Sequence, residues 1–330
     1  MIQVNQPEKK DPPKRMLKIE KQQDNRYRIE MNFSSLAIIQ ECLRKANYRL
    51  LNKYVNESDS DAQVFGKAIH KGLESWYMLP EQNRQLTDAE LKMVDSLIGG
   101  LTPESIYPTA LDSIYEFIKA AEPIHFLGDD DKRSIASGIK ILKNYFKHYA
   151  EDGLEVLRDS KGEAYIEKQV EGVLHEDDKM IIIFHGQIDL ILRNKISGQI
   201  HYSDHKTTAA LGKEFYNRIN PNHQYTGYVW AGNTFLGVES NSFMVNGIQV
   251  AKTKSEFARQ FTTIDEDMIH EMTMAYIEAG QRFINAIERN EFSMSSPNAC
   301  SSYGGCPYLD ICQSPANLRQ TIIENKYGVK

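Results

Sequence analysis

The chain has 330 residues, 41% of them hydrophobic and 25% charged, a balance that is typical of a globular protein and excludes a largely disordered one. No stretch approaches the roughly 20 apolar residues that a membrane-spanning helix needs, and the polar N-terminus lacks the apolar core of a secretory signal. A net charge of -6 provides no global attraction to nucleic acid, yet it does not exclude a DNA substrate. We therefore expect an intracellular, cytoplasmic protein of one large domain or two ordinary ones.

The chain is predicted to begin with a basic tail and a first helix. Residues 1–28 are rich in Lys, Gln and Pro, which favours a flexible tail. Apolar residues then recur at helical spacing from 36 to 50, which predicts a helix with Ser34 or Ser35 as its N-cap. Cys42 is expected to lie on this helix, one position away from the apolar stripe.

More helices are expected before the first strand. The sequence predicts a helix over 62–78 and three further helices within 87–150, separated near prolines. Residues 29–150 are therefore interpreted as a helical region.

The pattern changes to β-structure after Gly162. The stretch 179–194 is rich in β-branched residues, "KISGQ" is a typical turn, and 200–208 is the expected return strand of a hairpin. Strands followed by a helix and another strand indicate an α/β core with a helical N-terminal elaboration. We expect the core over 151–292 and a Cys-rich segment over 293–330. The other expected elements are strands over 163–174 and 241–252 and helices over 221–237 and 265–290.

The return strand ends in "SDHKTT", residues 203–208, which places an acid and a lysine two residues apart. Side chains on a strand alternate, so Asp204 and Lys206 point to the same face. An isolated pair of this kind is usually a solvated strand end. With Asp189 on the neighbouring strand of the hairpin, however, two carboxylates would lie close together.

Two carboxylates on adjacent strands suit a hard cation such as Mg²⁺ or Mn²⁺, and the backbone carbonyl of His205 can add a ligand. Imidazole suits Mn²⁺ better than Mg²⁺, which favours manganese if His70 joins the site. Such a cation can act as a Lewis acid in cutting a phosphodiester. Lys206 could orient the attacking water or neutralise developing negative charge.

Three further residues are weaker candidates. Gln224 and Tyr228 are four apart and so share one face of a helix, which is a common arrangement. Glu167, on the preceding strand, is either an exposed strand residue or a member of the site. Each residue alone is ordinary, and it is their order along the chain that carries information.

The ordered set resembles the RecB-like branch of the PD-(D/E)XK nuclease superfamily. The matching segments are "G-x-x-x-H" from Gly66 to His70, "G-x-I-D" from Gly186 to Asp189, "D-x-K" from Asp204 to Lys206, and "Q-x-x-x-Y" from Gln224 to Tyr228. The resemblance implies a restriction-endonuclease-like α/β core, with a mixed central sheet flanked by helices, that cuts DNA with Mg²⁺ or Mn²⁺. It also implies roles for individual residues: His70, Asp189 and Asp204 would bind the metal, Lys206 would be the catalytic lysine, and Gln224 and Tyr228 would contact substrate or brace the site.

The chain has four cysteines: Cys42 near its start, and Cys300, Cys306 and Cys312 near its end. Four is the number that an iron–sulfur cluster or a tetrahedral zinc ion needs, and a reducing compartment disfavours disulfides. One early and three late cysteines around the nuclease motifs are similar to the iron–sulfur nucleases, including AddB and the CRISPR-adaptation exonucleases. This resemblance implies a cluster, most simply 4Fe–4S. Zinc is the second possibility, because five residues separate Cys300 from Cys306 here, whereas the commoner ending is C-x2-C-x5-C. Four thiols without a metal are the third.

These features predict a metal-dependent deoxyribonuclease, an exonuclease that acts on DNA ends or single strands in recombination or repair. The sequence contains no G-x-x-x-x-G-K-[ST] phosphate loop, so any helicase or single-strand annealing protein would be a partner in trans. A bacterial or phage-encoded source would fit this reading. The alternatives are a non-catalytic DNA-binding or assembly module of the same fold, and a structure-specific or sequence-specific endonuclease.

Overall fold

The computed structural model divides the chain into two compact units, which are considered separately below. Unit 1 comprises Met1–Glu57, Val173–His185 and Thr273–Lys330, and unit 2 comprises Ser58–Gly172 and Gly186–Met272. Residues 1–16 of the expected tail, and the prolines expected to separate the helices, lie outside the described residues. The structure describes residues 17–55, 61–78, 86–98, 110–122, 132–252, 254–301 and 305–329.

A mixed β-sheet forms the framework, and two of its strands, β5 and β6, run through both units. In the described residues the hydrogen-bonded order is β1-β2-β6-β7-β8-β9, and β4 and β5 also pair with β6. The strands are β1 (Lys18–Lys21), β2 (Tyr27–Met31), β4 (Leu154–Val156), β5 (Ile166–Glu176), β6 (Met180–Asn194), β7 (Ile200–Thr208), β8 (Ser242–Gln249) and β9 (Phe257–Thr263).

Strand β7 is central to unit 2 because it joins the antiparallel and parallel parts of the sheet. It pairs antiparallel with β6, where Leu190 faces Ser203, and parallel with β8, where Lys206 faces Gly247. The expected hairpin of β6 and β7 is therefore confirmed, and so is the expected mixed α/β fold.

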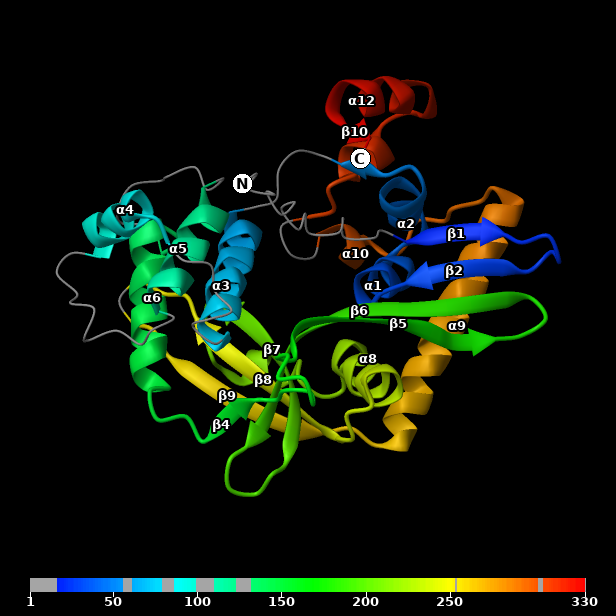
Figure 1. The fold of residues 1–330 in the computed structure, drawn as a ribbon. Helices are drawn as coiled ribbons and strands as arrows, with labels where there is room; N and C mark the ends of the chain where they lie inside the picture. Colours follow the sequence, from blue (N-terminus) through cyan, green and yellow to red (C-terminus); the bar gives the residue numbers. More distant parts are fainter. Residues whose placement is uncertain are drawn as a thin grey trace, which may run out of the picture. The chain divides into compact units, whose positions relative to one another are not determined.

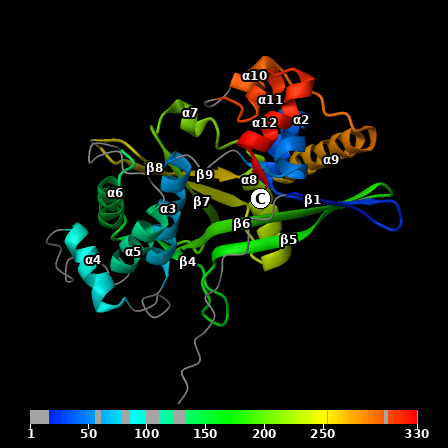
Figure 2. The ribbon, with the colours of Figure 1, turned by 90° about the horizontal axis from the view of Figure 1, so that it is seen from above.

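The helices of unit 2 cover its strands. Helices α3, α5 and α6 lie side by side next to β7 and β8 (Figures 1 and 2) and bury an apolar cluster that includes Phe65, Phe117 and Ile248. The expected helix over 62–78 and the three within 87–150 are confirmed. The helices of this unit are α3 (Asp61–Tyr77), α4 (Asp88–Ile98), α5 (Ala110–Ala121), α6 (Ile135–His148), α7 (Lys213–Tyr216) and α8 (His223–Ala231), which continues as a π-helical turn, η4 (Gly232–Leu236).

The alternation of side chains along β8 separates its two faces. Phe243 stacks on Tyr225 of α8, with ring centroids 4.4 Å apart. Asn246 points the other way and contacts Tyr145 of α6, and Ile248 joins the cluster of α3, α5 and α6. Both faces are covered, which explains why "SFMVNGIQ" is buried over almost its whole length.

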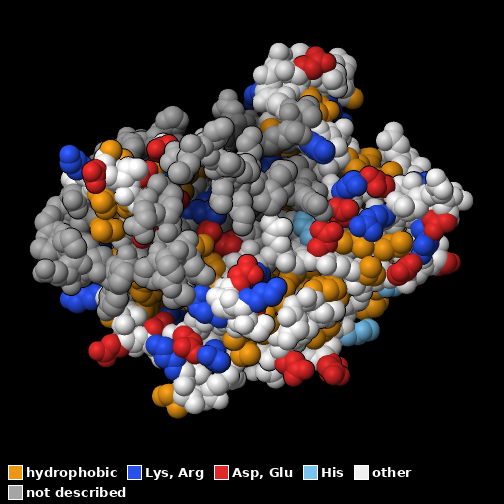
Figure 3. Space-filling model, in the orientation of Figure 1, with side chains coloured by type: hydrophobic (Ala, Val, Ile, Leu, Met, Phe, Trp, Pro, Cys, Tyr) orange, Lys and Arg blue, Asp and Glu red, His pale blue; other side chains and the backbone are white. Residues whose placement is uncertain are grey.

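Unit 1 combines β1, β2 and the first part of β6 with helices. Gly280 of α9 lies close to Met180 and Ile182, and a Cβ at this position would come 3.3 Å from the Met180 sulfur. Positive and negative side chains intermingle over β1 and β2 (Figure 3), and Lys18 pairs with Glu20. The remaining elements of this unit are α1 (Phe33–Glu41), α2 (Leu43–Ala46), η1 (Asn47–Leu51), β3 (Tyr54–Val55), α9 (Glu266–Arg289, which begins in unit 2), α10 (Pro297–Ser301), α11 (Leu309–Gln313), η6 (Ala316–Leu318), α12 (Arg319–Lys326) and β10 (Gly328–Val329).

Two predictions about the start of the chain are wrong. Residues 18–21 and 27–31 form strands β1 and β2 rather than part of a flexible tail, because their backbones pair with each other and with β6. The first helix ends at Glu41, and Cys42 lies in extended conformation between α1 and α2 rather than on a continuous helix. The predicted N-cap, Ser34 or Ser35, is wrong as well: both lie inside α1, and its N-cap is Asn32, whose side chain accepts a hydrogen bond from the Ser35 amide.

Candidate active site

The two carboxylates expected to lie together do so, on the hairpin of β6 and β7 in unit 2. Asp189 on β6 places Oδ2 3.2 Å from Nδ1 of His70 on α3, and the same oxygen accepts a hydrogen bond of 2.9 Å from the His205 amide. On β7, the Lys206 ammonium lies 2.7 Å from Oδ2 of Asp204, whose side chain is 3% exposed. The pairing of β6 and β7 therefore brings together two carboxylates and a lysine, and helix α3 adds an imidazole.

Glu167 joins this cluster from β5. Potential ligand atoms of His70, Glu167 and Asp189 all lie within 4.8 Å of one another. Gln187 of β6 donates a hydrogen bond of 2.5 Å to Glu167 and holds its carboxyl in place. Glu167 has a φ of 49°, a left-handed conformation that non-glycine residues rarely adopt, which is typical of functional sites.

The carboxyl groups have very different pKa values. Burial, together with the charges of Asp189 and Glu74, raises the pKa of Glu167 to about 8. Burial also raises the pKa of Asp204 to about 6, although Lys206 opposes this shift. For Asp189, the interaction with His70 outweighs burial and lowers the pKa. A protein that places three carboxyls in one buried site raises the pKa of some of them, unless a cation neutralises the repulsion.

The two basic side chains stay charged more easily than usual. Burial disfavours the Lys206 ammonium, but the carboxylates of Asp204 and Asp189 outweigh it and raise the pKa. Burial likewise opposes protonation of His70, and Asp189 reverses the balance and raises the pKa. The carboxyls of Glu167 and Asp189 and the imidazole of His70 form a donor set rich in oxygen, which fits Mg²⁺ or Mn²⁺.

Helix α8 contributes Gln224 and Tyr228, which are joined to each other. The Gln224 side-chain amide donates a hydrogen bond of 3.0 Å to the Tyr228 hydroxyl. Tyr225 of the same helix interacts electrostatically with the carboxyl groups. Burial raises its pKa, and the interactions with Asp204, Tyr228 and Asp189 raise it further. The expected pair is therefore joined by a hydrogen bond on this helix, and Tyr225, which lies between them in the sequence, is a residue that we did not predict.

After Tyr225, His205 is a second residue whose side-chain contacts were not predicted from the sequence. Its Nδ1 lies 2.8 Å from the side-chain nitrogen of Asn246, and its ring stacks on Tyr77. Burial lowers the pKa of His205 to about 3, so the ring is neutral at physiological pH. Asn246 carries a signal that could have been noticed, since its amide side chain interrupts the middle of an apolar strand.

The four cysteines lie in unit 1 and line one pocket together with Lys45, Tyr48 and Tyr308, which we call the cysteine pocket. The Cys306 amide donates a hydrogen bond of 2.8 Å to the Cys300 carbonyl. All four are free thiols, and among the described residues no three of their sulfur atoms come within 4.8 Å of one another. Burial raises the pKa of Cys306 and of Cys312.

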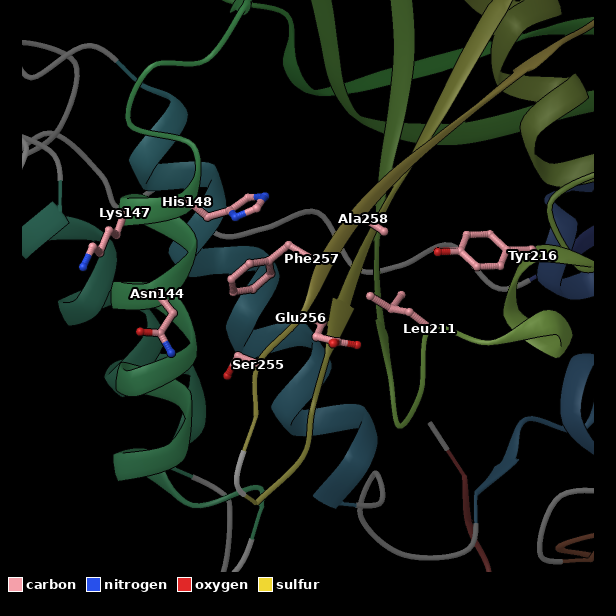
Figure 4. Close-up of a pocket in the computed structure, with 9 residues that line it drawn as sticks. All are labelled: Asn144, Lys147, His148, Leu211, Tyr216, Ser255, Glu256, Phe257 and Ala258. Atoms are coloured by element: carbon pink, nitrogen blue, oxygen red, sulfur yellow. The ribbon is translucent and has the colours of Figure 1, made fainter.

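A separate cavity of about 770 Å³ lies elsewhere in unit 2 (Figure 4). Asn144, Lys147 and His148 of α6 line one side, and Phe257 and Ala258 of β9 also line it. None of the expected site residues lines this cavity.

The carboxyls and imidazole gathered on this mixed sheet could hold a metal ion, and comparison with known proteins gives the family of the chain. A sequence model described as "PD-(D/E)XK nuclease superfamily" matches residues 30–313, so the chain belongs to this superfamily. Among solved structures, it is similar to one named "Putative exonuclease" from Eubacterium rectale, at 13% identity and a TM-score of 0.42, which covers 82% of this chain and 86% of that one.

A second solved structure, of a protein designated SSO0001, is similar at 10% identity and a TM-score of 0.29, and it covers 74% of this chain and 84% of that one. No curated protein matches the chain. None of the described helices is long and apolar enough to cross a lipid bilayer.

Proposed function

We propose that the protein is a metal-dependent deoxyribonuclease, and specifically an exonuclease that acts on DNA ends or single strands in recombination or repair. One observation carries the proposal: His70, Glu167 and Asp189 place potential ligand atoms within 4.8 Å of one another in unit 2, and strand β7, which pairs with the strand of Asp189, carries the Asp204–Lys206 pair. The membership of the superfamily supports a nuclease, and the ordered motifs support its RecB-like branch.

The residues of the cluster would divide the work. His70, Asp189, Asp204, Glu167 and the His205 carbonyl are the groups that would hold Mg²⁺ or Mn²⁺, which supplies Lewis acidity when bound. Lys206 has a raised pKa, so it remains an ammonium and is suited to stabilising charge on the reacting phosphate rather than accepting a proton. Gln224 and Tyr228 would brace the site or contact the substrate.

The cysteine pocket is proposed to hold an iron–sulfur cluster, of the 4Fe–4S type, with zinc as the second candidate. A tetrahedral zinc ion with Zn–S bonds of about 2.3 Å would bring its sulfur atoms to about 3.8 Å from one another. The support for either group is that all four cysteines line a single pocket.

The test is cleavage of end-labelled linear DNA, single- and double-stranded, beside closed circles, with Mn²⁺ or Mg²⁺ and protein purified without oxygen. We expect loss of label from linear DNA, intact circles, and no activity in Lys206→Ala. Lys161→Ala is the matched control, because Lys161 is exposed in a turn of unit 2. Cleavage by Lys206→Ala at the wild-type rate would overturn the proposal.

The same experiment separates the alternatives. Cutting of closed circles would indicate a structure-specific or sequence-specific endonuclease. Binding of DNA without cleavage, by protein that retains its metal, would indicate a non-catalytic binding or assembly module. A cytoplasmic role in bacterial or phage recombination, with a helicase or annealing protein in trans, belongs to the exonuclease proposal and would be tested by stimulation of cleavage by such a protein.

A further inference from the structure

Behind the candidate site, a chain of buried hydrogen bonds connects the edge of the sheet in unit 2 to His205. We call it the His205 network, and it begins at Asp152, whose carboxylate accepts two hydrogen bonds from Arg259 at 2.7 and 2.6 Å. Arg259 also donates to the Tyr77 hydroxyl at 3.3 Å, and its guanidinium lies 3.8 Å above the ring of Tyr149. Side-chain exposures of 11% and 14% show that the Arg259–Asp152 pair is largely removed from water.

The network continues through the interior to the strand that bears Asp204 and Lys206. The hydroxyls of Tyr77 and Tyr145 lie 2.7 Å apart. The Asn246 side-chain nitrogen is 2.5 Å from the Tyr145 hydroxyl and 2.8 Å from Nδ1 of His205. Tyr145 and Asn246 are fully buried, and His205 is 4% exposed. Buried polar groups at these distances are costly to disturb, so they fix the geometry of what they hold.

His205 is where this network meets the candidate site. Its amide donates the 2.9 Å hydrogen bond to Asp189, and its ring stands edge-on to the ring of His70 with centroids 5.7 Å apart. The side chain is neither a cation nor exposed to solvent, and its neighbours on three sides are Asn246, Tyr77 and His70. Rotation of this ring would require both the Asn246 hydrogen bond and the stack on Tyr77 to break.

We propose that Asn246 and the side chain of His205 are positioning residues of the nuclease site, which hold the His205 amide on Asp189 and the ring of His70 at its angle. The proposal rests on the proposed function and extends it to residues that the superfamily motifs do not include. Asn246 does not touch the carboxylates, so its effect must pass through His205. Groups that orient metal ligands in this way typically change metal affinity or activity by about 10- to 100-fold when removed.

The test compares Asn246→Ala with a matched control on the same strand as His205. Tyr202 of β7 is also fully buried, and its hydroxyl donates at 2.9 Å to Asn233 and 2.6 Å to the Val238 carbonyl. Tyr202→Phe therefore removes buried hydrogen bonds from β7 without touching the His205 network. Three quantities are measured for each protein: the Kd for Mn²⁺ by calorimetry, kcat and KM on single-stranded DNA, and the Tm of the metal-free protein.

We expect Asn246→Ala to raise the Kd for Mn²⁺ about tenfold or more and to lower kcat while the KM for DNA stays unchanged. Tyr202→Phe should lower Tm but leave Kd and kcat at wild-type values. If Asn246→Ala lowers Tm with no change in Kd or kcat, its role is structural only and the inference fails. If Asn246→Ala does not fold, Tyr145→Phe replaces it, because this variant removes only the hydroxyl next to Asn246, and an unchanged Kd would again overturn the inference.

The two proposals can fail separately. If the wild-type protein binds Mn²⁺ and cuts DNA, and Asn246→Ala has the same Kd, kcat and KM, the proposed function stands and the positioning role is rejected. Wild-type protein that folds but neither binds Mn²⁺ nor cuts DNA rejects the proposed function, and the positioning role with it.

Discussion

The candidate active site in unit 2 and the cysteine pocket in unit 1 hold their functional side chains in opposite ways. In the active site, side chains from α3, β5, β6 and β7 contact one another directly, as in the pairs His70–Asp189 and Lys206–Asp204. In the cysteine pocket, four thiols line one space, but no three of their described sulfur atoms come close together. One site is thus held together by direct contacts between its side chains, whereas the proposed cluster would be what connects the thiols of the other.

The difference has an electrostatic origin. Carboxylates can pair with His70 and Lys206, so the active site offsets part of its own charge repulsion. Burial disfavours the charged thiolates and so raises the pKa of Cys306 and Cys312. A bound metal group would stabilise the thiolates. We therefore expect metal loss to affect the two sites differently.

The largest effect is expected from Asp189→Asn. The variant keeps the shape of the side chain and an oxygen for the His205 amide, but it removes the charge that pairs with His70. We expect the affinity for Mn²⁺ and the rate of DNA cleavage each to fall by about 100-fold or more, measured by calorimetry and by release of end label. Asp177→Asn, in a turn of unit 1, is the control and should leave both unchanged; equal losses in the two variants would contradict the assignment.

Cys306→Ser should affect the other site. Because a serine oxygen is a poor ligand for iron, we expect protein purified without oxygen to lose most of its iron. The free energy of unfolding should fall by about 3 kcal/mol, since the bound group closes a long loop in the unfolded chain. Metal analysis and urea titration measure both effects. Full iron content in the variant would argue against the cluster, and stoichiometric zinc in the wild type would favour the second candidate.

Sequence reasoning succeeded where the information is local. The hairpin of β6 and β7 follows from β-branched residues on both sides of a turn, and pairing then places Asp189 near Asp204 without knowledge of the rest of the fold. The stripe of apolar residues from 36 to 50 is buried as expected. The apolar stripe did not predict that the helix is interrupted at Cys42, however, because apolar residues can keep their helical spacing across a residue in extended conformation.

What the sequence could not supply depends on the pairing of distant strands. Gln187 and Asn246 acquire their partners only once β5 lies beside β6 and β7 beside β8. Three strands were also missed, the edge strands β1 and β9 and their neighbour in the sheet β2: they carry many polar residues, so their weak alternation resembles a loop. The contacts between side chains that orient the ligands are therefore harder to predict than the ligands themselves.

A smaller effect is expected from pH in the metal-free protein. The pKa of Glu167 is raised to about 8 by burial and its acidic neighbours, so the folded state binds a proton that the unfolded state releases above about 4.5. Stability from this carboxyl is thus present at low pH and is lost as pH rises towards 8. We expect Glu167→Gln to gain stability relative to wild type from pH 5 to 8, by at most about 1.4 kcal/mol per pH unit. Urea titrations across this range measure the difference, and a constant difference would mean that Glu167 does not titrate in the window.

The smallest effects are expected from helix caps, one in each unit. Asn32 caps α1, which leads to Cys42, and Ser134 caps α6, which carries Tyr145 of the His205 network. Each change to Ala should lower the free energy of unfolding by about 1 kcal/mol, because a cap satisfies a backbone amide at the start of a helix. Only Asn32→Ala should also speed the loss of iron to a chelator, since it loosens the helix that precedes Cys42. Equal rates of iron loss in the two variants would show that the stability of α1 does not affect the cysteine pocket. The two sites would then differ in their chemistry but not in how far they depend on neighbouring helices.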